Sequence, residues 1–525
     1  MTTAVETRVP APAPARTSRI KLALIDRLPL LLILLLQVFL AYQLANTAFE
    51  DEALYVYAGH RELDFLLHGT PTYDTYASYF SGAPFLYPVA AAVVDTPFGL
   101  EGVRALSLLA MLGATAFVWM TARRLYGKPA AVVAAGLFAV AAPTLFLSRL
   151  ATYDAPAVLL LALALWIAVR TARGPVALVL LAAPPLALAA GVKYASTLYL
   201  PTVVVVAVLA VPATAAVIRR RVWLRGAVRG LLLGGAVAGL IALGLDLAGP
   251  QLRAGLSQTT VNRAAGAEPV SNILRLSAVW GGWVFVLGAI GCVYVARRRT
   301  PEARRPGPVL LAAALTGTAL LATAYQAHLG TSVSLHKHIG FGLLFAAPVA
   351  GAGLAGLARL DRLGTAGLRP ALRAVPGLAL GVCVLLAFYA NHVVGPMYEG
   401  WPDSSGMVAA LRPLVQQGPQ HYLVEENEIP RYYLGDQVQP YEWLTTYFFQ
   451  YTDKTGKSLV GLPAYQAAIN DRYFDLVVLD FGPTAPVDAQ ITTALKGSGG
   501  GYHLVAKVPG KTSHGVQYYS IWQRS

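Results

Sequence analysis

Long runs of apolar residues recur over the first three quarters of the chain, separated by short polar segments. A helix needs about 20 consecutive apolar residues to cross the hydrocarbon core of a bilayer. Many of the runs are close to this length, so the pattern predicts about eleven membrane-spanning helices. We place them at residues 28–47, 103–122, 129–147, 156–170, 175–192, 197–217, 228–247, 276–296, 308–325, 339–357 and 374–394.

The pattern changes near residue 396, where polar and charged residues become frequent. Short β-branched and aromatic runs predict buried strands at residues 422–424 and 474–479, and a terminal strand pair at 502–508 and 515–522. A helix is expected at 464–470. The predicted fold is therefore an α-helical polytopic membrane domain, residues 28–395, followed by a compact α/β domain, residues 396–525.

Composition supports this division. The chain is 56% hydrophobic and only 13% charged, whereas about a quarter of a soluble domain is charged. The Pro- and Ala-rich residues 1–27 are expected to form a disordered cytoplasmic tail. Cys292 and Cys383 both fall inside apolar runs, so we interpret them as packing residues and not as a disulfide.

The net charge of +14 would suit nucleic acid, but its distribution indicates membrane topology. Lys and Arg are roughly three times as frequent in one set of alternate loops as in the other, which is the bias of cytoplasmic loops. The rich segments lie within residues 8–27, 123–128, 170–173, 219–229, 297–305 and 359–373. We therefore predict a plasma-membrane protein with its N-terminus inside, its C-terminal domain outside and no nucleic-acid partner.

Residues 48–101 then form a long outer loop that starts with three acids, Glu50, Asp51 and Glu52. A helix is expected from residue 52 to 67, and residues 85–94 are interpreted as a second helix lying along the membrane interface. One interpretation of the acids is simply a solvated helix start, which the helix dipole favours. Their position at the membrane surface also suits a general base, because partial shielding from water raises the pKa of a carboxylate.

Other candidates lie on the predicted outer side. Asp154 precedes Pro156 and is interpreted equally well as a helix cap or as a site acid. Lys193 is either a snorkelling lysine or a contact for an anionic lipid. Further candidates for a phosphate are Arg263 and Lys337, and for substrate or metal His60, Arg61, His336 and His338. His336 and His338 would share a face only in an extended strand, so a metal there is the weaker interpretation and a divalent metal stays open.

Two absences narrow the chemistry. The sequence contains no Asp-x-Asp, the metal–nucleotide clamp of many soluble nucleotide-sugar transferases. Neither Gly-Lys-Ser/Thr site, at Gly456 and Gly510, has the preceding glycine of a Walker loop. A donor with a single phosphodiester needs less cation help than a nucleotide diphosphate, so Lys and Arg would suffice.

Three pieces of the chain resemble the C-type-fold membrane glycosyltransferases that use lipid-phosphate sugars, in particular the aminoarabinose transferase and protein O-mannosyltransferase group (glycosyltransferase family 39). These pieces are Asp51-Glu52-Ala53-Leu54-Tyr55, Arg123-Arg124-Leu125-Tyr126-Gly127 followed by Ser148-Arg149-Leu150-Ala151-x-x-Asp154, and Gly191-Val192-Lys193-Tyr194. The resemblance implies a catalytic base at Asp51, a second-loop acid at Asp154 and a donor-phosphate contact at Lys193. Where aminoarabinose transferases carry Glu-Lys-Pro-Pro, this chain reads Gly82-Ala83-Pro84-Phe85-Leu86-Tyr87-Pro88.

The sequence thus predicts inverting transfer of a sugar from a polyprenyl-phosphate donor to a hydroxyl of a cell-envelope acceptor outside the membrane. A single displacement needs one base, unlike the paired carboxylates of retaining glycosidases. A flippase or transporter of lipid-linked sugars is the alternative, which the scarcity of ionisable residues in the spans disfavours. A non-catalytic membrane scaffold that presents the α/β domain is a further alternative.

Overall fold

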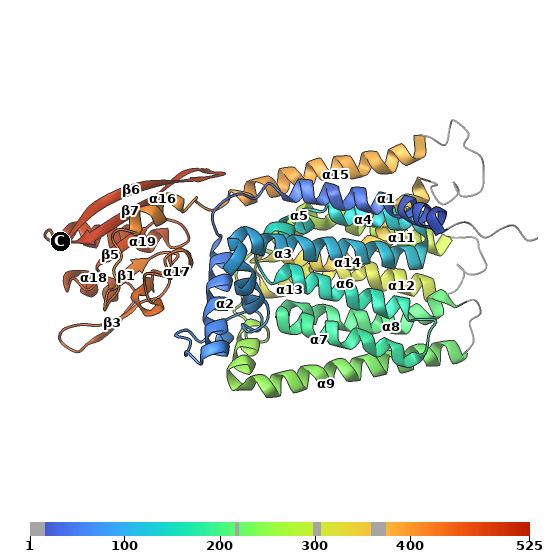
Figure 1. Cartoon of the computed structure of the whole chain (residues 1–525), viewed down its shortest axis with the longest axis horizontal. Coiled ribbons are helices and arrows are strands. Elements are labelled where there is room, and N and C mark those ends of the chain that lie inside the picture. The colour runs from blue at the N-terminus through green and yellow to red at the C-terminus, as the bar shows by residue number, and fades with distance from the viewer. Residues whose placement is uncertain (1–15, 216–219, 298–305, 359–373) are drawn as a thin grey trace, which may run out of the picture.

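The computed structural model describes residues 16–215, 220–297, 306–358 and 374–525. A bundle of roughly parallel helices forms one part of the molecule, and a small mixed domain lies beyond one end of it (Figure 1). The bundle contains α1 (Arg16–Ala41), α3 (Tyr87–Tyr126), α4 (Lys128–Ala139), α5 (Ala142–Arg149), α6 (Asp154–Arg170), η2 (Val176–Ala182), α7 (Ala183–Val192), η3 (Tyr194–Tyr199), α8 (Leu200–Thr214), α9 (Arg220–Thr259), α10 (Val270–Ser277), η4 (Ala278–Gly282), α11 (Trp283–Arg297), α12 (Pro306–Gly317), η5 (Thr318–Leu320), α13 (Leu321–Leu329), α14 (Leu335–Leu357) and α15 (Ala374–Tyr398).

Within the described ranges, 7 helices are long and apolar enough to cross a membrane, or up to 8 if the bent pair α4–α5 forms one span. The shorter α6, the stretch Val176–Val192 and α1 run beside them (Figure 1). Each apolar run predicted from the sequence therefore coincides with a helix or a broken helix. This confirms a multi-pass helical membrane protein.

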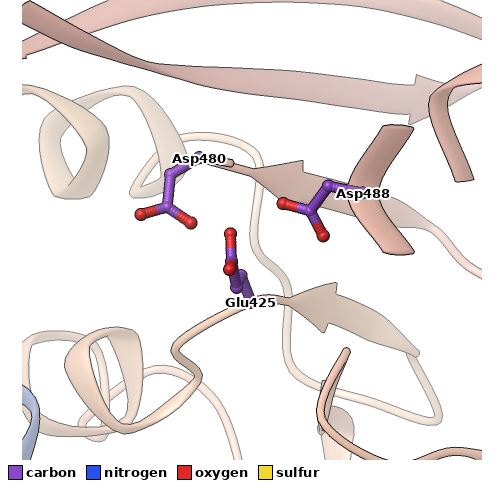
Figure 2. A group of neighbouring side chains, drawn as sticks. All are labelled: Glu425, Asp480 and Asp488. Atoms are coloured by element: carbon purple, nitrogen blue, oxygen red, sulfur yellow. The ribbon is translucent and has the colours of Figure 1, made fainter. Parts of the chain in front are cut away.

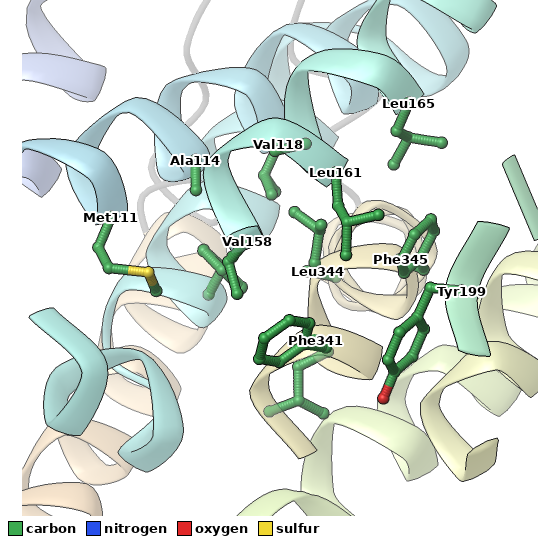
Figure 3. Packing of buried hydrophobic residues seen from close by; sticks show 14 of the residues in the cluster. Met111, Ala114, Val118, Val158, Leu161, Leu165, Tyr199, Phe341, Leu344 and Phe345 are labelled. Atoms are coloured by element: carbon green, nitrogen blue, oxygen red, sulfur yellow. The ribbon is translucent and has the colours of Figure 1, made fainter. Parts of the chain in front are cut away.

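Helix α14 lies at the centre of the bundle, and 94% of the residues in its most apolar 18-residue stretch are buried. Phe341, Leu344 and Phe345 of this helix pack against residues of α3 and α6 and against Tyr199 (Figure 3). Lipid tails are as apolar as these side chains, so close van der Waals packing holds such helices together. Small residues allow it: a Cβ on Gly351 would lie 2.5 Å from the Ala130 carbonyl oxygen. The first turn of α14 is thus held rigidly at the bundle end that faces the small domain.

The first predicted outer loop is mostly helical. Helix α2 (Glu50–His68) lies across the end of the bundle, between the bundle and the small domain (Figure 1), and ends at Gly69, whose φ of 73° suits glycine. A short η1 (Tyr76–Ser78) follows. Most of the predicted interfacial segment, residues 87–94, is the first part of α3, and the helix breaks at Gly99 with φ 62°.

The N-terminal tail differs from its prediction. Residues 1–15 lie outside the described residues, but residues 16–27 are not a disordered tail, because they form the first turns of α1. No glycine or proline occurs between Arg16 and Pro29, so nothing in this stretch interrupts the helix that enters the membrane.

The small domain is an α/β domain, as predicted, and consists of a five-stranded sheet and a two-stranded sheet, β3-β4, with helices around them. The sheet order is β2-β1-β5-β7-β6, with β1 parallel to β2 and β5, and β7 antiparallel to β5 and β6. Its elements are α16 (Ser405–Leu411), β1 (Tyr422–Val424), α17 (Glu428–Tyr433), η8 (Pro440–Glu442), β2 (Trp443–Thr445), β3 (Gln450–Thr452), β4 (Ser458–Val460), α18 (Leu462–Asn470), β5 (Leu476–Leu479), α19 (Ala485–Gly497), β6 (Tyr502–Thr512) and β7 (Gly515–Arg524).

Helix α17 joins this domain to α2. The Ala48 backbone N–H donates to the Tyr433 hydroxyl at 2.9 Å, and Arg431 pairs with Asp74 of the first loop at 2.9 Å. Ala48 and Ala53 pack into the apolar core of the small domain. The domain therefore covers α2 directly.

Candidate active site

The three consecutive acids at the start of α2 have three different environments. Glu52 is fully buried and pairs with Arg104, whose Nη2 lies 2.6 Å from Glu52 Oε2. Its Oε1 also accepts from the backbone N–H of Ala151 at 2.7 Å. Burial of an ion pair is tolerated when further hydrogen bonds satisfy the charges. Glu52 thus joins α2 to the bundle, and its oxygens are not free for a substrate.

Asp51 faces a different partner. Its Oδ2 accepts from Lys337 Nζ at 2.6 Å, its Oδ1 accepts from the Tyr55 hydroxyl at 3.2 Å, and 30% of its side chain is exposed. Tyr55 sits one helical turn after Asp51, and its hydroxyl lies 2.6 Å from that of Tyr153. Burial raises the pKa of Asp51, but the charge and hydrogen bond of Lys337 outweigh it, so this pKa lies below its ordinary value. Asp51 is an ionised, oriented carboxylate that substrate can reach.

Glu50 is directed toward the small domain. Burial and the neighbouring carboxylates of Glu426 and Glu428 raise the pKa of Glu50 to about 9. Burial also raises the pKa of Glu426, to about 8. At neutral pH these carboxyl groups therefore hold protons. Glu50 is therefore unsuited to the role of a base.

Asp154 and Lys193 form a second ion pair beside Asp51. Lys193 Nζ lies 3.3 Å from Asp154 Oδ1 and 4.3 Å from the centre of the Tyr153 ring. Helix α6 starts at Asp154, with Tyr153 in the capping position, so the cap interpretation of Asp154 is wrong. The carboxylate is used by Lys193 instead. The charges of both groups act on Asp51.

A cavity of about 500 Å³ opens next to this pair. Lys193, Arg263 and His338 line it together with apolar residues such as Leu198 and Pro201. Two cations, Lys193 and Arg263, in the wall of a cavity that also has apolar and hydroxyl side chains suit an amphiphilic anion. The structure thus brings together two of the three predicted phosphate contacts, whereas it places the third, Lys337, on Asp51.

The remaining candidates do not converge on Asp51. His60 pairs with Asp95 at 2.8 Å, and the Arg61 guanidinium lies over the Tyr57 ring. His336 packs edge-on against Phe146 and beside Trp280. His336 and His338 both belong to the helical α14, so they point to different faces, as their spacing predicts for a helix.

Among the described residues, one group of three acids could hold a metal, and it lies in the small domain. Glu425, Asp480 and Asp488, here called the C-terminal triad, are all buried, and their oxygens converge (Figure 2). Carboxylate oxygens are suitable ligands for Mg²⁺ or Ca²⁺. Several are already used within the chain: the Gly482 and Thr484 N–H groups donate to Glu425. The triad fits a divalent cation by charge and spacing but is also satisfied by the protein itself.

The sequence reasoning missed the tyrosines and the triad. Tyr55 could have been found from its i+4 spacing to Asp51 on a predicted helix. Tyr153 directly precedes Asp154. Glu425 and Asp480 each follow a buried strand, and β1 and β5 are neighbouring parallel strands, so their carboxyl ends meet.

Comparisons with known proteins indicate the class of protein. Residues 83–237 match the model of the dolichyl-phosphate-mannose-protein mannosyltransferase family. A search of curated protein sequences found no match.

Solved structures share the fold over nearly the whole chain. ArnT from Cupriavidus metallidurans bound to undecaprenyl phosphate is similar at 15% identity and a TM-score of 0.54, covering 97% of this chain and 98% of that chain. The oligosaccharyltransferase AglB from Archaeoglobus fulgidus, in complex with an inhibitory peptide and a dolichol-phosphate, is similar at 14% identity and a TM-score of 0.57, covering 96% and 74%. Its complex with Zn and sulfate matches at 14% identity and a TM-score of 0.53, covering 94% and 72%.

The chain therefore has the C-type fold of membrane glycosyltransferases. The family match, which spans part of the membrane domain, and this fold together indicate a glycosyltransferase.

Proposed function

We propose that the protein transfers a sugar, with inversion, from a polyprenyl-phosphate donor to a hydroxyl of a cell-envelope glycan, lipid or protein on the outer face of the membrane. The observation that carries this proposal is the placement of Asp51. It is a partly exposed carboxylate held by Tyr55 and Lys337, next to a cavity that holds the cations Lys193 and Arg263. The undecaprenyl phosphate in ArnT and the dolichol-phosphate in AglB support the donor class.

In the proposed reaction, Asp51 accepts the proton of the acceptor hydroxyl. The acceptor oxygen forms a bond to the anomeric carbon while the bond from that carbon to the phosphate oxygen breaks. The electron pair leaves with polyprenyl phosphate, which gains a negative charge. Lys193 and Arg263 would stabilise that charge as it develops. One carboxylate suffices because no covalent enzyme intermediate forms.

The first test is Asp51→Asn in the full chain in lipid nanodiscs, assayed for release of polyprenyl phosphate from a panel of polyprenyl-phosphate sugars in the presence of envelope extract. Loss of a general base lowers the rate by about 10²–10⁴-fold. The matched control is Asp436→Asn, which changes an exposed acid of the small domain. Transfer by Asp51→Asn at the rate of the control would overturn the assignment of the base.

A further inference from the structure

Lys337 has spare hydrogen-bonding capacity at the site. An ammonium group has three N–H donors. In the described part of the chain, the one hydrogen bond recorded for Lys337 Nζ goes to Asp51. Lys337 is 5% exposed and also lies over the Phe49 ring, at 5.8 Å. The lysine is therefore a buried cation whose main partner is the carboxylate proposed as the base.

The same turn of α14 also borders the cavity. Ser334 and His338, on either side of Lys337 in the chain, both line it with Lys193 and Arg263. The N-terminus of a helix carries a partial positive charge, which adds to these cations. An anion bound by Lys193 and Arg263 would thus lie at the turn that carries Lys337, and it would compete with Asp51 for the ammonium group.

We propose that Lys337 masks the base in the donor-free protein, and that the phosphodiester of the donor releases Asp51 by taking over the Lys337 ammonium group. This inference rests on the proposed function. It makes Lys337 a positioning residue that couples donor binding to activation of the acceptor. No bond forms or breaks in this step; a hydrogen bond is exchanged from a carboxylate to a phosphate oxygen.

The charges near Asp51 determine how its pKa changes when the donor binds. A nearby cation lowers the pKa of a carboxylate by about one to three units, and a nearby anion raises it. Sharing of Lys337 with a phosphate therefore makes Asp51 more basic, and the charge of the phosphate acts in the same direction. Proton abstraction from the acceptor therefore becomes effective only when a donor is bound.

Several charged or titratable groups face Asp51 from the surrounding elements, and all except Lys337 stay constant in the comparison below. They are Glu50 and Tyr55 on α2, Tyr153 and Asp154 at the start of α6, Lys193 after α7, His336 and Lys337 on α14 and Glu428 on α17.

The experiment is a pH titration of the full chain in nanodiscs, with and without undecaprenyl phosphate, followed by infrared spectroscopy. The carboxyl stretching band of Asp51 is identified by its absence in Asp51→Asn. In the wild type we expect undecaprenyl phosphate to raise the Asp51 pKa by about one unit or more. In Lys337→Met the Asp51 pKa should already be raised without the lipid, and the lipid should raise it further by clearly less than in the wild type, because only the charge of the phosphate then acts. Lys457→Met, an exposed lysine of the small domain, should respond as the wild type does.

Binding of undecaprenyl phosphate is measured in parallel, by displacement of a fluorescent polyprenyl phosphate. If the wild type binds the lipid and the Asp51 pKa does not move, the masking role of Lys337 is wrong while the donor class stands. An equal pKa rise in the wild type and in Lys337→Met would also refute it. If the wild type does not bind the lipid, the proposed function itself fails.

Discussion

Two groups of three acids lie in different parts of the molecule, and their charges are compensated in different ways. In the membrane domain, three acids are paired with cations: Glu52 with Arg104, Asp51 with Lys337 and Asp154 with Lys193, whereas their neighbour Glu50 keeps its proton. In the C-terminal triad, no ion pair to Lys, Arg or His is found among the described residues. Backbone N–H groups satisfy Glu425, and protons must neutralise the rest.

The difference shows in the acids themselves. Burial and the neighbouring Glu425 raise the pKa of Asp480 and of Asp488, whereas hydrogen bonds outweigh burial and lower the pKa of Glu425. The triad therefore holds protons at neutral pH, as expected for like charges in a dry site. Pairing with cations keeps carboxylates ionised and oriented, as a general base must be, whereas a protonated carboxyl group cannot accept a proton. The comparison favours the membrane-domain acids as the reactive ones.

The largest effect on stability should come from Glu52→Gln. This change leaves the buried Arg104 guanidinium without its main counter-ion, and breaking a buried pair costs about 3–5 kcal/mol. We expect a large drop in the temperature of unfolding, measured by tryptophan fluorescence of the protein in nanodiscs.

The matched control for this change is Glu101→Gln, which also removes a partner of Arg104. The Glu101 side chain is 56% exposed, and exposed pairs contribute about 0–1 kcal/mol. Equal destabilisation by the two variants would mean that the Glu52–Arg104 pair has no special structural role.

The next effect concerns donor binding. Lys193→Met removes a buried cation from the cavity wall and leaves Asp154 without its partner. A charged hydrogen bond contributes about 1.5–3 kcal/mol, so we expect polyprenyl phosphate to bind about 10- to 100-fold more weakly, measured by fluorescence displacement. Lys193→Arg should recover part of the affinity. Unchanged binding by Lys193→Met would place the phosphate elsewhere.

The sequence was enough to find the three acids and two of their cationic partners, Lys193 and Lys337, but not which acid each cation pairs with. Asp51 stands out because the first apolar run ends just before three acids, and the helix that follows is marked by periodicity and by Gly69. Its partner Lys337 is 286 residues away. Only the packing of α14 in the centre of the bundle brings the two together. Which apolar helices are neighbours cannot be predicted from the pattern of a single sequence.

The small domain shows the same limit from the other side. Its strands were predicted from local apolar runs, and the structure confirms β1, β5, β6 and β7. The triad depends on β1 and β5 being neighbours, with Asp488 reaching them from α19. Strand order is a property of long-range pairing, so the acids looked like three unrelated loop residues.

A smaller effect is expected from pH on the small domain. Asp480 and Asp488 have pKa values raised by burial and by Glu425, so the stability that their protons contribute is present at low pH and is lost as pH rises through the raised values. We expect the unfolding temperature of the domain in the wild type to fall from about pH 4, the ordinary pKa of an aspartate, to about pH 10, the raised pKa of Asp480. The unfolding temperature of Asp480→Asn, whose side-chain amide needs no proton, should fall less. Parallel curves for the two proteins would show that the triad is not held by protons.

The smallest effect is expected from removal of metal. A divalent cation in the triad would replace the protons, and its chelation would leave like charges close together in a buried site. Because the chain's own N–H groups and protons already satisfy Glu425, we expect EDTA to shift the unfolding temperature of the small domain by less than about 1 °C at neutral pH. Asp480→Asn treated in the same way is the control. A fall of several degrees in the wild type alone would show that the triad holds a metal. The two groups of acids would then differ in the kind of cation that neutralises them: lysine and arginine side chains in the membrane domain, and a metal ion in the small domain.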